Sequence, residues 1–338
     1  MRLVYIRKRV FLLPNGEIRK GASDRMREFA DLHCDVLAKL LTGEAASFDG
    51  PGSEGLDVTH EGLTASGAVL QTFAVWLPKR VPQTFLSVAA AVDLFFRRVL
   101  SRPNMTLVRS PADLAACAPG RPGALLALEG AEGLEGSISA LHLLHRLGLR
   151  MLGLTWNDAN WAADGIMEPR GGGLTRAGRE LVRACNELGI IVDVSHLSER
   201  AFWDTIEQSA RPVVASHSNV RSVCAHPRNL ADDQIRAIID AGGLIGLTFV
   251  PWFVRDGGTV GPEDLIPHIE KVLELGGERH LALGSDYDGI DRHVRGLDGP
   301  RGTAEFLDML AGRYGDGLAE NIARGNAFRF LSNQLPPA

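Results

Sequence analysis

Five residues of the types that bind metal ions stand at or just beyond the ends of short apolar runs: His33, Asp35, Glu129, His196 and His217. In an extended strand, residues i and i+2 project to the same side, so His33 and Asp35 can hold one ion together. His196 and His217 can hold a second ion, and the two oxygens of Glu129 can contact one ion each. Imidazole and carboxylate ligands without thiolate suit Zn²⁺, with Fe²⁺, Mn²⁺ or Co²⁺ as alternatives. Each residue alone has a simpler explanation, but their conjunction predicts a two-metal site with a shared hydroxide nucleophile.

Three further polar residues are candidates for other roles at this site. Asp286 ends another apolar run and is a candidate proton shuttle, because a carboxylate facing a bound hydroxide can accept its proton and pass it on. Asp288 competes for this role, and either could instead be a structural residue of the Gly-rich turn. Arg228 follows His217 in a loop, where a guanidinium can bind a substrate carboxylate through two hydrogen bonds. The more common alternative for a loop arginine is a surface ion pair.

The ligand candidates are spread over about half of the chain, so the fold must bring distant strand ends together. Eight nearly continuous apolar runs predict buried parallel strands, at residues 29–33, 68–76, 124–129, 151–156, 190–196, 212–217, 244–250 and 281–286. Segments of helical period separate them, at residues 85–100, 138–147, 175–188, 198–208, 232–241, 262–275 and 303–311. The alternation predicts a (β/α)8 TIM barrel, with an open doubly wound sheet as the alternative. In a barrel, the carboxyl ends of the strands form one ring, where active sites lie.

Composition narrows the class of protein. No linker or low-complexity tract divides the 338 residues, so we expect a catalytic barrel domain over residues 28–332 and an N-terminal extension over residues 1–27. The net charge of −5 gives no case for nucleic acid. The four cysteines are far apart, which favours reduced thiols. No apolar run has membrane-spanning length and no signal-peptide core is present, so we expect a cytoplasmic protein without a membrane partner.

Eight motifs occur in order along the chain. They are D-x-H-x-D at 31–35, A-L-E-G at 127–130, G-L-R-M-L-G-L-T-W-N at 148–157, D-V-S-H at 193–196, S-H-S-N-V-R at 216–221, H-P-R-N at 226–229, G-S-D-Y-D-G at 284–289 and G-N-A-F-R-F at 325–330. In this series the chain resembles the membrane (renal) dipeptidases and their soluble bacterial relatives. The resemblance covers roughly residues 28–332.

The resemblance implies a metallo-dipeptidase that hydrolyses small dipeptides, often L-Xaa-D-Xaa, by a metal-bridging hydroxide. It implies two Zn²⁺ ions per chain, one on His33, Asp35 and Glu129 and the other on Glu129, His196 and His217. It also implies that Arg228 binds the C-terminal carboxylate of the dipeptide and that Asp286 contacts the substrate and handles the proton. A homodimer is the implied assembly.

One residue departs from the family pattern. Many relatives have a histidine where this chain has Trp156, and that histidine is thought to hold the scissile carbonyl group. The Trp156 indole can donate only one hydrogen bond, and Asn157 or Asn160 can take over contact with the substrate. Two alternatives to a dipeptidase therefore stay open. One is a related binuclear-metal barrel hydrolase that acts on another amide, a lactam or a lactone, and the other is a barrel that has lost catalysis.

Overall fold

The computed structural model describes residues 27–50 and 52–337. Except for Arg27, the predicted N-terminal extension of residues 1–27 lies outside the described residues. Arg27 pairs with Asp308 and Asp316. Among the described residues, none of the helices combines the length and the apolar composition that crossing a membrane requires.

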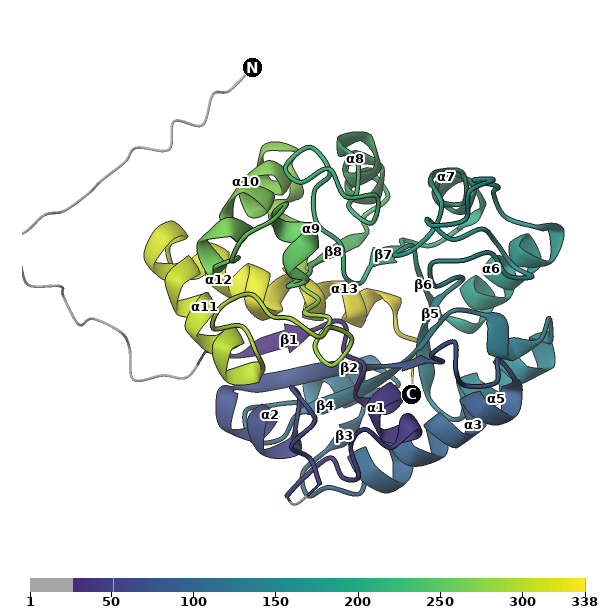
Figure 1. Ribbon diagram of the computed structural model, residues 1–338, viewed down its shortest axis with the longest axis horizontal. Coiled ribbons are helices and arrows are strands. Elements are labelled where there is room, and N and C mark those ends of the chain that lie inside the picture. Colours follow the sequence, from purple (N-terminus) through teal and green to yellow (C-terminus); the bar gives the residue numbers. More distant parts are fainter. Residues whose placement is uncertain (1–26, 51, 338) are drawn as a thin grey trace, which may run out of the picture.

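Eight parallel strands form a closed barrel surrounded by helices (Figure 1). The strands are β1 (Phe29–Asp31), β2 (Ala68–Trp76), β4 (Gly123–Glu129), β5 (Leu149–Gly153), β6 (Ile191–Asp193), β7 (Val214–Ala215), β8 (Leu244–Leu247) and β9 (Leu281–Leu283). Their order is β2-β1-β9-β8-β7-β6-β5-β4, and pairing of β4 with β2 closes the ring. The prediction of a (β/α)8 barrel with eight strands is confirmed. A further strand, β3 (Thr106–Leu107), pairs with the start of β4 and was not predicted.

The helices of the barrel are bounded as follows. They are α1 (Val36–Thr42), α2 (His60–Ser66), α3 (Phe85–Leu94), α4 (Pro111–Ala115), α5 (Ile138–Arg146), α6 (Arg176–Leu188), α7 (Glu199–Gln208), α8 (Asp232–Asp240), α9 (Pro251–Val254), α10 (Ile266–Glu274), α11 (Pro300–Tyr314), α12 (Asp316–Glu320) and α13 (Asn326–Gln334). Local signals bound α6: the Thr175 hydroxyl caps its start by accepting the N–H of Gly178, and Gly189, with φ 71°, ends it. The predicted helix at 85–100 divides into α3 and a π-helical turn, Phe95–Val99.

Alternation along the strands decides which side chains reach the barrel interior. In β4, Leu126 and Leu128 pack outward beneath the helices, whereas Leu125 and Ala127 pack in an inner apolar cluster. The same alternation turns Glu129, the last residue of β4, toward the inside. The strand therefore delivers one carboxylate to the mouth of the barrel.

Several strands are shorter than their predicted runs, and the polar residues lie in the turns just beyond them. β1 ends at Asp31, β6 at Asp193 and β7 at Ala215. The backbone conformation is one reason for the early ends of β6 and β9. His196 and Asp286, which follow these strands, adopt left-handed φ angles of 69° and 66°, and such angles end regular strand pairing.

Candidate metal centre and substrate cleft

The five predicted metal-binding residues come together at the carboxyl-terminal mouth of the barrel. His33 and Asp35 follow β1, Glu129 ends β4, and His196 and His217 follow β6 and β7. Their exposed fractions are at most 9%. Three groups of possible ligands are found among the described residues, and the donor atoms within each lie within 4.8 Å of one another: His33–Asp35–Glu129, Glu129–His196–His217 and His33–His217–Asp286. The residues thus assemble in the two predicted sets, with Glu129 in both.

Glu129 faces the two sets with different oxygens. Its Oε2 lies 3.4 Å from His33 Nε2, whereas its Oε1 lies 2.8 Å from His196 Nε2 and 3.6 Å from His217 Nε2. On the first side, Asp35 Oδ2 also lies 3.4 Å from His33 Nε2. This geometry suits a carboxylate that bridges two cations.

The first set contains polar atoms without partners. His33 Nε2 and Asp35 Oδ1 are buried and make no hydrogen bond. Burial lowers the pKa of His33, but the carboxylates of Glu129 and Asp35 outweigh burial and hold this pKa well above its ordinary value. A cluster that attracts a proton this strongly attracts a metal cation for the same electrostatic reason.

Hydrogen bonds on the outer edges of the rings set the tautomers of the second set. His196 Nδ1 lies 2.8 Å from the side-chain oxygen of Asn157, and His217 Nδ1 lies 2.8 Å from the Ser216 hydroxyl. That hydroxyl donates its own proton to the Asp193 carboxylate, so it accepts from His217. Both Nδ1 atoms therefore donate, which leaves a lone pair on each Nε2.

The lone pairs of the second set point at one another. His196 Nε2 and His217 Nε2 are 2.9 Å apart, and both face Glu129 Oε1. Burial lowers the pKa of His196 to about 4 and that of His217 well below its ordinary value, so neither ring supplies a proton. Three acceptors converging in this way require a cation between them, and nitrogen and oxygen donors in this number fit Zn²⁺.

Two matching Asp–Ser clamps lie beneath the metal-binding residues. Asp31 accepts the Ser285 hydroxyl at 2.6 Å and the Ser285 N–H at 2.8 Å. Asp193 likewise accepts the Ser216 hydroxyl and, at 3.0 Å, the Ser216 N–H. Each clamp joins the ends of two neighbouring strands, and only the Ser216 hydroxyl also contacts a histidine ring. Sequence analysis missed both clamps, although the spacing of Asp31 and His33 was visible.

Asp286 and Asp288 have different environments. Asp286 Oδ1 lies 3.7 Å from His33 Nε2 at the centre. Burial raises the pKa of Asp286 to about 8, and the nearby carboxylates of Asp35 and Glu129 add to this rise. In contrast, Asp288 accepts the N–H groups of Asp57 and Val58 and pairs with Lys39 at 3.1 Å. The Asp288 carboxylate is thus committed to the fold, which leaves Asp286 as the candidate for proton transfer.

Arg228 is buried beside the centre, with an exposed fraction of 4%. Its Nε has no hydrogen-bond partner, its Nη2 reaches only the carbonyl oxygen of His217 at 3.4 Å, and its guanidinium lies 5.5 Å from the Phe253 ring. Burial lowers the pKa of Arg228 to about 10, so the group is charged at neutral pH. A surface ion pair is therefore the wrong description of this arginine. A buried guanidinium with a free donor is a site for an anion.

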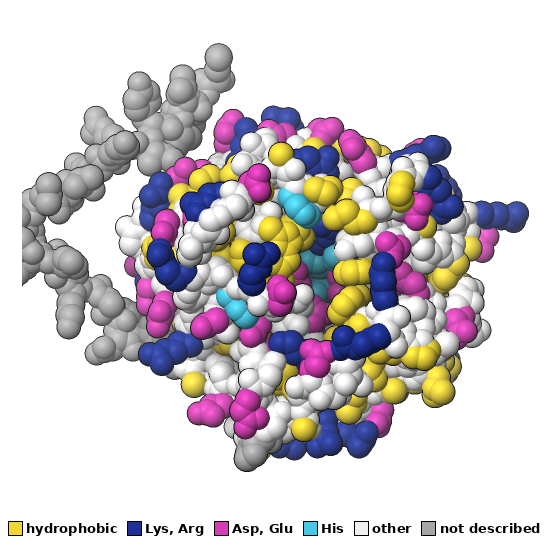
Figure 2. All heavy atoms as spheres, viewed as in Figure 1, with side chains coloured by type: hydrophobic (Ala, Val, Ile, Leu, Met, Phe, Trp, Pro, Cys, Tyr) yellow, Lys and Arg dark blue, Asp and Glu magenta, His cyan; other side chains and the backbone are white. Residues whose placement is uncertain are grey.

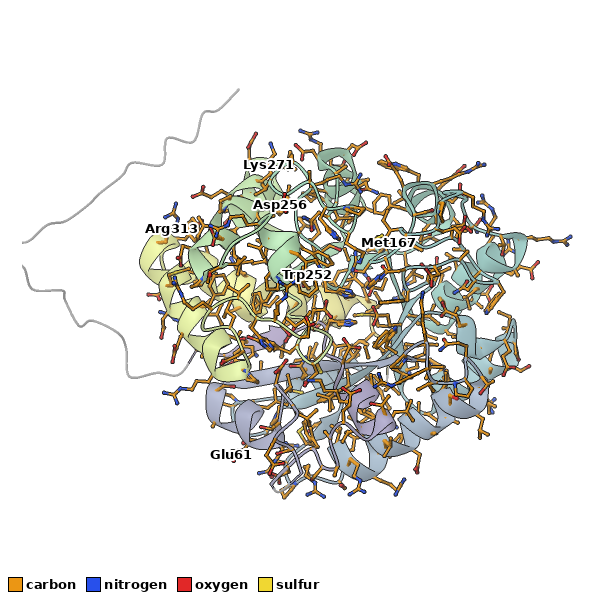
Figure 3. The ribbon with its side chains drawn as sticks, viewed as in Figure 1. Glu61, Met167, Trp252, Asp256, Lys271 and Arg313 are labelled. Atoms are coloured by element: carbon orange, nitrogen blue, oxygen red, sulfur yellow. The ribbon has the colours of Figure 1, made fainter. Side chains whose placement is uncertain are left out.

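One cleft of about 190 Å³ is lined by Asp35, Glu129, His196, Arg228 and Asp286. Figure 2 shows the opening as a hollow in which histidine and acidic side chains are flanked by hydrophobic ones. Met167, from the loop between β5 and α6, and Trp252, from the short helix α9, stand at its rim (Figure 3). Trp76, Trp156 and Phe253 complete the aromatic part of the lining. The cleft thus combines a metal-binding centre, a buried cation and aromatic walls.

Comparison with known proteins shows which family has a chain of this kind. Residues 24–335 match the sequence profile of the membrane dipeptidases, peptidase family M19. The chain belongs to this family. Its members are metallo-dipeptidases, hydrolases that act on peptide bonds, so the family and enzyme class expected from the motifs are confirmed.

Individual relatives agree with the family assignment. The crystal structure of the dipeptidase AC, a metallo peptidase, matches with a TM-score of 0.85 and 27% identity over 92% of this chain and 99% of that one. A metallo peptidase from Rhodobacter sphaeroides, liganded with a phosphinate mimic of the dipeptide L-Ala-D-Ala, matches with a TM-score of 0.82 and 27% identity over 92% of this chain and 100% of that one.

Curated relatives match over shorter stretches. An uncharacterized protein in the pqqA 5' region of Klebsiella pneumoniae is 39% identical over 197 residues, which cover 55% of this chain and 72% of that protein. The dipeptidase tcpJ of Claviceps purpurea is 38% identical over 183 residues, which cover 53% of this chain and 42% of that protein. The chain thus matches less than half the length of the Claviceps protein.

Other predicted positions in this dipeptidase-family chain are placed as follows. Trp156 lines the cleft beside Trp76, with ring centroids 5.1 Å apart, and Asn157 lines it next to His196. His226 also lines the cleft, where its ring lies against that of Phe253 with centroids 4.4 Å apart. Six other histidines take part in none of the possible ligand groups found among the described residues: His60, His142, His145, His268, His280 and His293.

Proposed function

We propose that this protein is a zinc-dependent dipeptidase that hydrolyses small dipeptides, including L-Xaa-D-Xaa substrates, by a hydroxide bridging two Zn²⁺ ions. The observation that carries this proposal is the buried Arg228 guanidinium beside the metal centre, in a cleft of about 190 Å³. A free C-terminal carboxylate is the substrate group that such a guanidinium recognises. The bound dipeptide mimic of the Rhodobacter sphaeroides relative supports the same substrate class.

The residues proposed to hold the metal are the two sets already described. His33, Asp35 and Glu129 would hold one ion, and Glu129, His196 and His217 the other. When bound, the ions supply a Lewis acid for the scissile carbonyl and a water of lowered pKa. Ions held there would lie beside Arg228, so a dipeptide whose carboxylate binds Arg228 would have its peptide bond facing them.

The remaining steps belong to the protein's own side chains. Arg228 holds the C-terminal carboxylate and so orients the peptide bond toward Glu129. Asp286 accepts the proton of the attacking water and delivers it to the nitrogen of the departing amine as the peptide C–N bond breaks. Asn157 accepts from His196 through its oxygen, and its amide nitrogen is proposed to donate to the carbonyl oxygen of the substrate.

The test combines metal analysis with a substrate panel on one preparation. We expect about two zinc ions per chain, hydrolysis of L-Ala-L-Ala and L-Ala-D-Ala, loss of activity with a chelator and recovery with zinc. The C-terminal amide of L-Ala-D-Ala should be a poor substrate, because it offers Arg228 no charge. Bound metal without dipeptide cleavage would point to another amide, a lactam or a lactone. A protein that takes up no metal would refute the ligand sets.

A further inference from the structure

A second pocket adjoins the metal centre, and the proposed mechanism does not use it. This side pocket, of about 240 Å³, shares Trp76, Glu129 and Trp156 with the cleft, whereas Arg228 does not line it. Because Glu129 is at the metal centre, the side pocket begins where the scissile bond is expected. It is therefore within reach of a substrate bound in the cleft.

The side pocket has aromatic and polar walls. The rings of Trp76 and Trp156 stand 5.1 Å apart at an interplanar angle of 46° on the side that it shares with the cleft. The rest of its lining includes Leu77, Gln83 and three charged side chains, Lys79, Glu132 and Asp158. A long side chain can lie along the aromatic faces and reach these charges.

The charges in the side pocket do not cancel. Lys79 and Asp158 pair with each other at the rim, where both are more than half exposed. Glu132 makes no ion pair with any basic side chain of the described residues. Its carboxylate lies over the backbone of Gly130, where a Cβ atom would collide with it. Burial raises the pKa of Glu132, although hydrogen bonds from the Asn160 side chain and the Trp156 backbone oppose the rise.

We propose that the side pocket binds the side chain of the dipeptide's N-terminal residue and, through Glu132, selects a basic one such as lysine. This inference rests on the proposed dipeptidase activity. If Arg228 holds the C-terminal carboxylate and the scissile bond lies at Glu129, the N-terminal residue is left on the side where this pocket opens. A basic side chain gives Glu132 its missing partner, whereas an acidic one would meet Glu132, Asp158 and Glu129 together.

The experiment compares two substrates that differ in one charge, L-Lys-D-Ala and L-norleucyl-D-Ala, with L-Ala-D-Ala as reference. In the zinc-loaded full-length enzyme, we expect kcat/KM for the lysine substrate to exceed that for the norleucine substrate by about tenfold, the scale of one hydrogen bond to a charged group. In Glu132→Gln this ratio should fall toward one. Lys79→Met should raise the ratio, because it releases Asp158 from its ion pair.

The matched control is Glu135→Gln. Glu135 is a nearby carboxylate that accepts the N–H of Phe85 and does not line the side pocket, so its loss should leave the lysine-to-norleucine ratio unchanged. No lysine preference in the wild type, or an equal ratio in the wild type and Glu132→Gln, would overturn the inference. The opposite shift expected in Lys79→Met keeps the test decisive even if Glu132→Gln does not fold. If the enzyme cleaves none of the three substrates, the proposed dipeptidase function would instead be refuted.

Discussion

The Ser216 hydroxyl should control how tightly the second metal ion binds. Its oxygen accepts from His217 Nδ1 at 2.8 Å while its proton goes to Asp193, so it holds the ring in the tautomer whose Nε2 faces Glu129. In Ser216→Ala, the ring either keeps a buried N–H without an acceptor, which costs about 1–3 kcal/mol, or moves its proton to the metal-binding nitrogen. Loss of such an outer hydrogen bond lowers metal affinity by about 10- to 100-fold.

Zinc affinity is measured by competition with a chromogenic chelator, and the tautomer by nitrogen NMR of histidine-labelled, metal-free protein. We expect one of the two zinc ions to be weakened in Ser216→Ala. Ser285→Ala is the matched control, because Ser285 makes the same contact with Asp31 at 2.6 Å but touches no histidine ring. Equal affinity losses in the two variants, or an unchanged His217 tautomer in Ser216→Ala, would refute the reasoning.

Three other outcomes follow from the site. Glu129→Gln should bind fewer than the proposed two zinc ions and lose activity, because one oxygen of the bridge no longer carries charge; full metal content by elemental analysis would contradict the bridging role. Arg228→Met should retain zinc and lower kcat/KM for dipeptides by about 100-fold or more, chiefly through KM, since a buried charged contact is lost; an unchanged KM would exclude Arg228 as the carboxylate anchor. Lys39→Met leaves Asp288 buried without its cation, and urea unfolding should record a loss of about 1 kcal/mol at pH 8, one unit above the Asp288 pKa. Burial already raises the pKa of Asp288 to about 7, so Asp288 is ionised in the folded protein, and its pairing with Lys39 contributes to stability, only above about that pH. The loss should therefore shrink at pH 5, where Asp288 is protonated, and an equal loss at both pH values would contradict this account.

Much of the barrel was predictable because buried parallel strands leave a direct record in the sequence. The run at 124–129 is apolar on both faces, and the alternation of its residues continues to Glu129, which therefore turns inward. The ligand sets were predictable for a related reason. His33, His196 and His217 each follow a strand, and a closed parallel barrel brings all such ends to one mouth.

The rest depends on contacts between distant segments, which leave no local pattern. The left-handed backbone at His196 and Asp286 has only a weak signal in their residue types, since His and Asp adopt it more often than most other non-glycine residues but still rarely. The Asp193–Ser216 clamp joins residues 23 positions apart, and the Asp31–Ser285 clamp joins residues 254 positions apart. The domain limits, the homodimer and the cytoplasmic location stay predictions.

The two clamps explain how this fold can hold metal ligands that come from turns. β1 and β9 are neighbours in the barrel, as are β6 and β7, and each clamp ties the ends of one such pair together. The turns that carry His33 and His217 are therefore held by strand register and by a buried carboxylate. Glu129 belongs to the seven-residue pairing of β4 with β2, which closes the barrel. Because the strand ends are fixed in this way, the fold holds the acceptor atoms of His196, His217 and Glu129 close together although they repel one another. A bound cation would turn this repulsion into attraction.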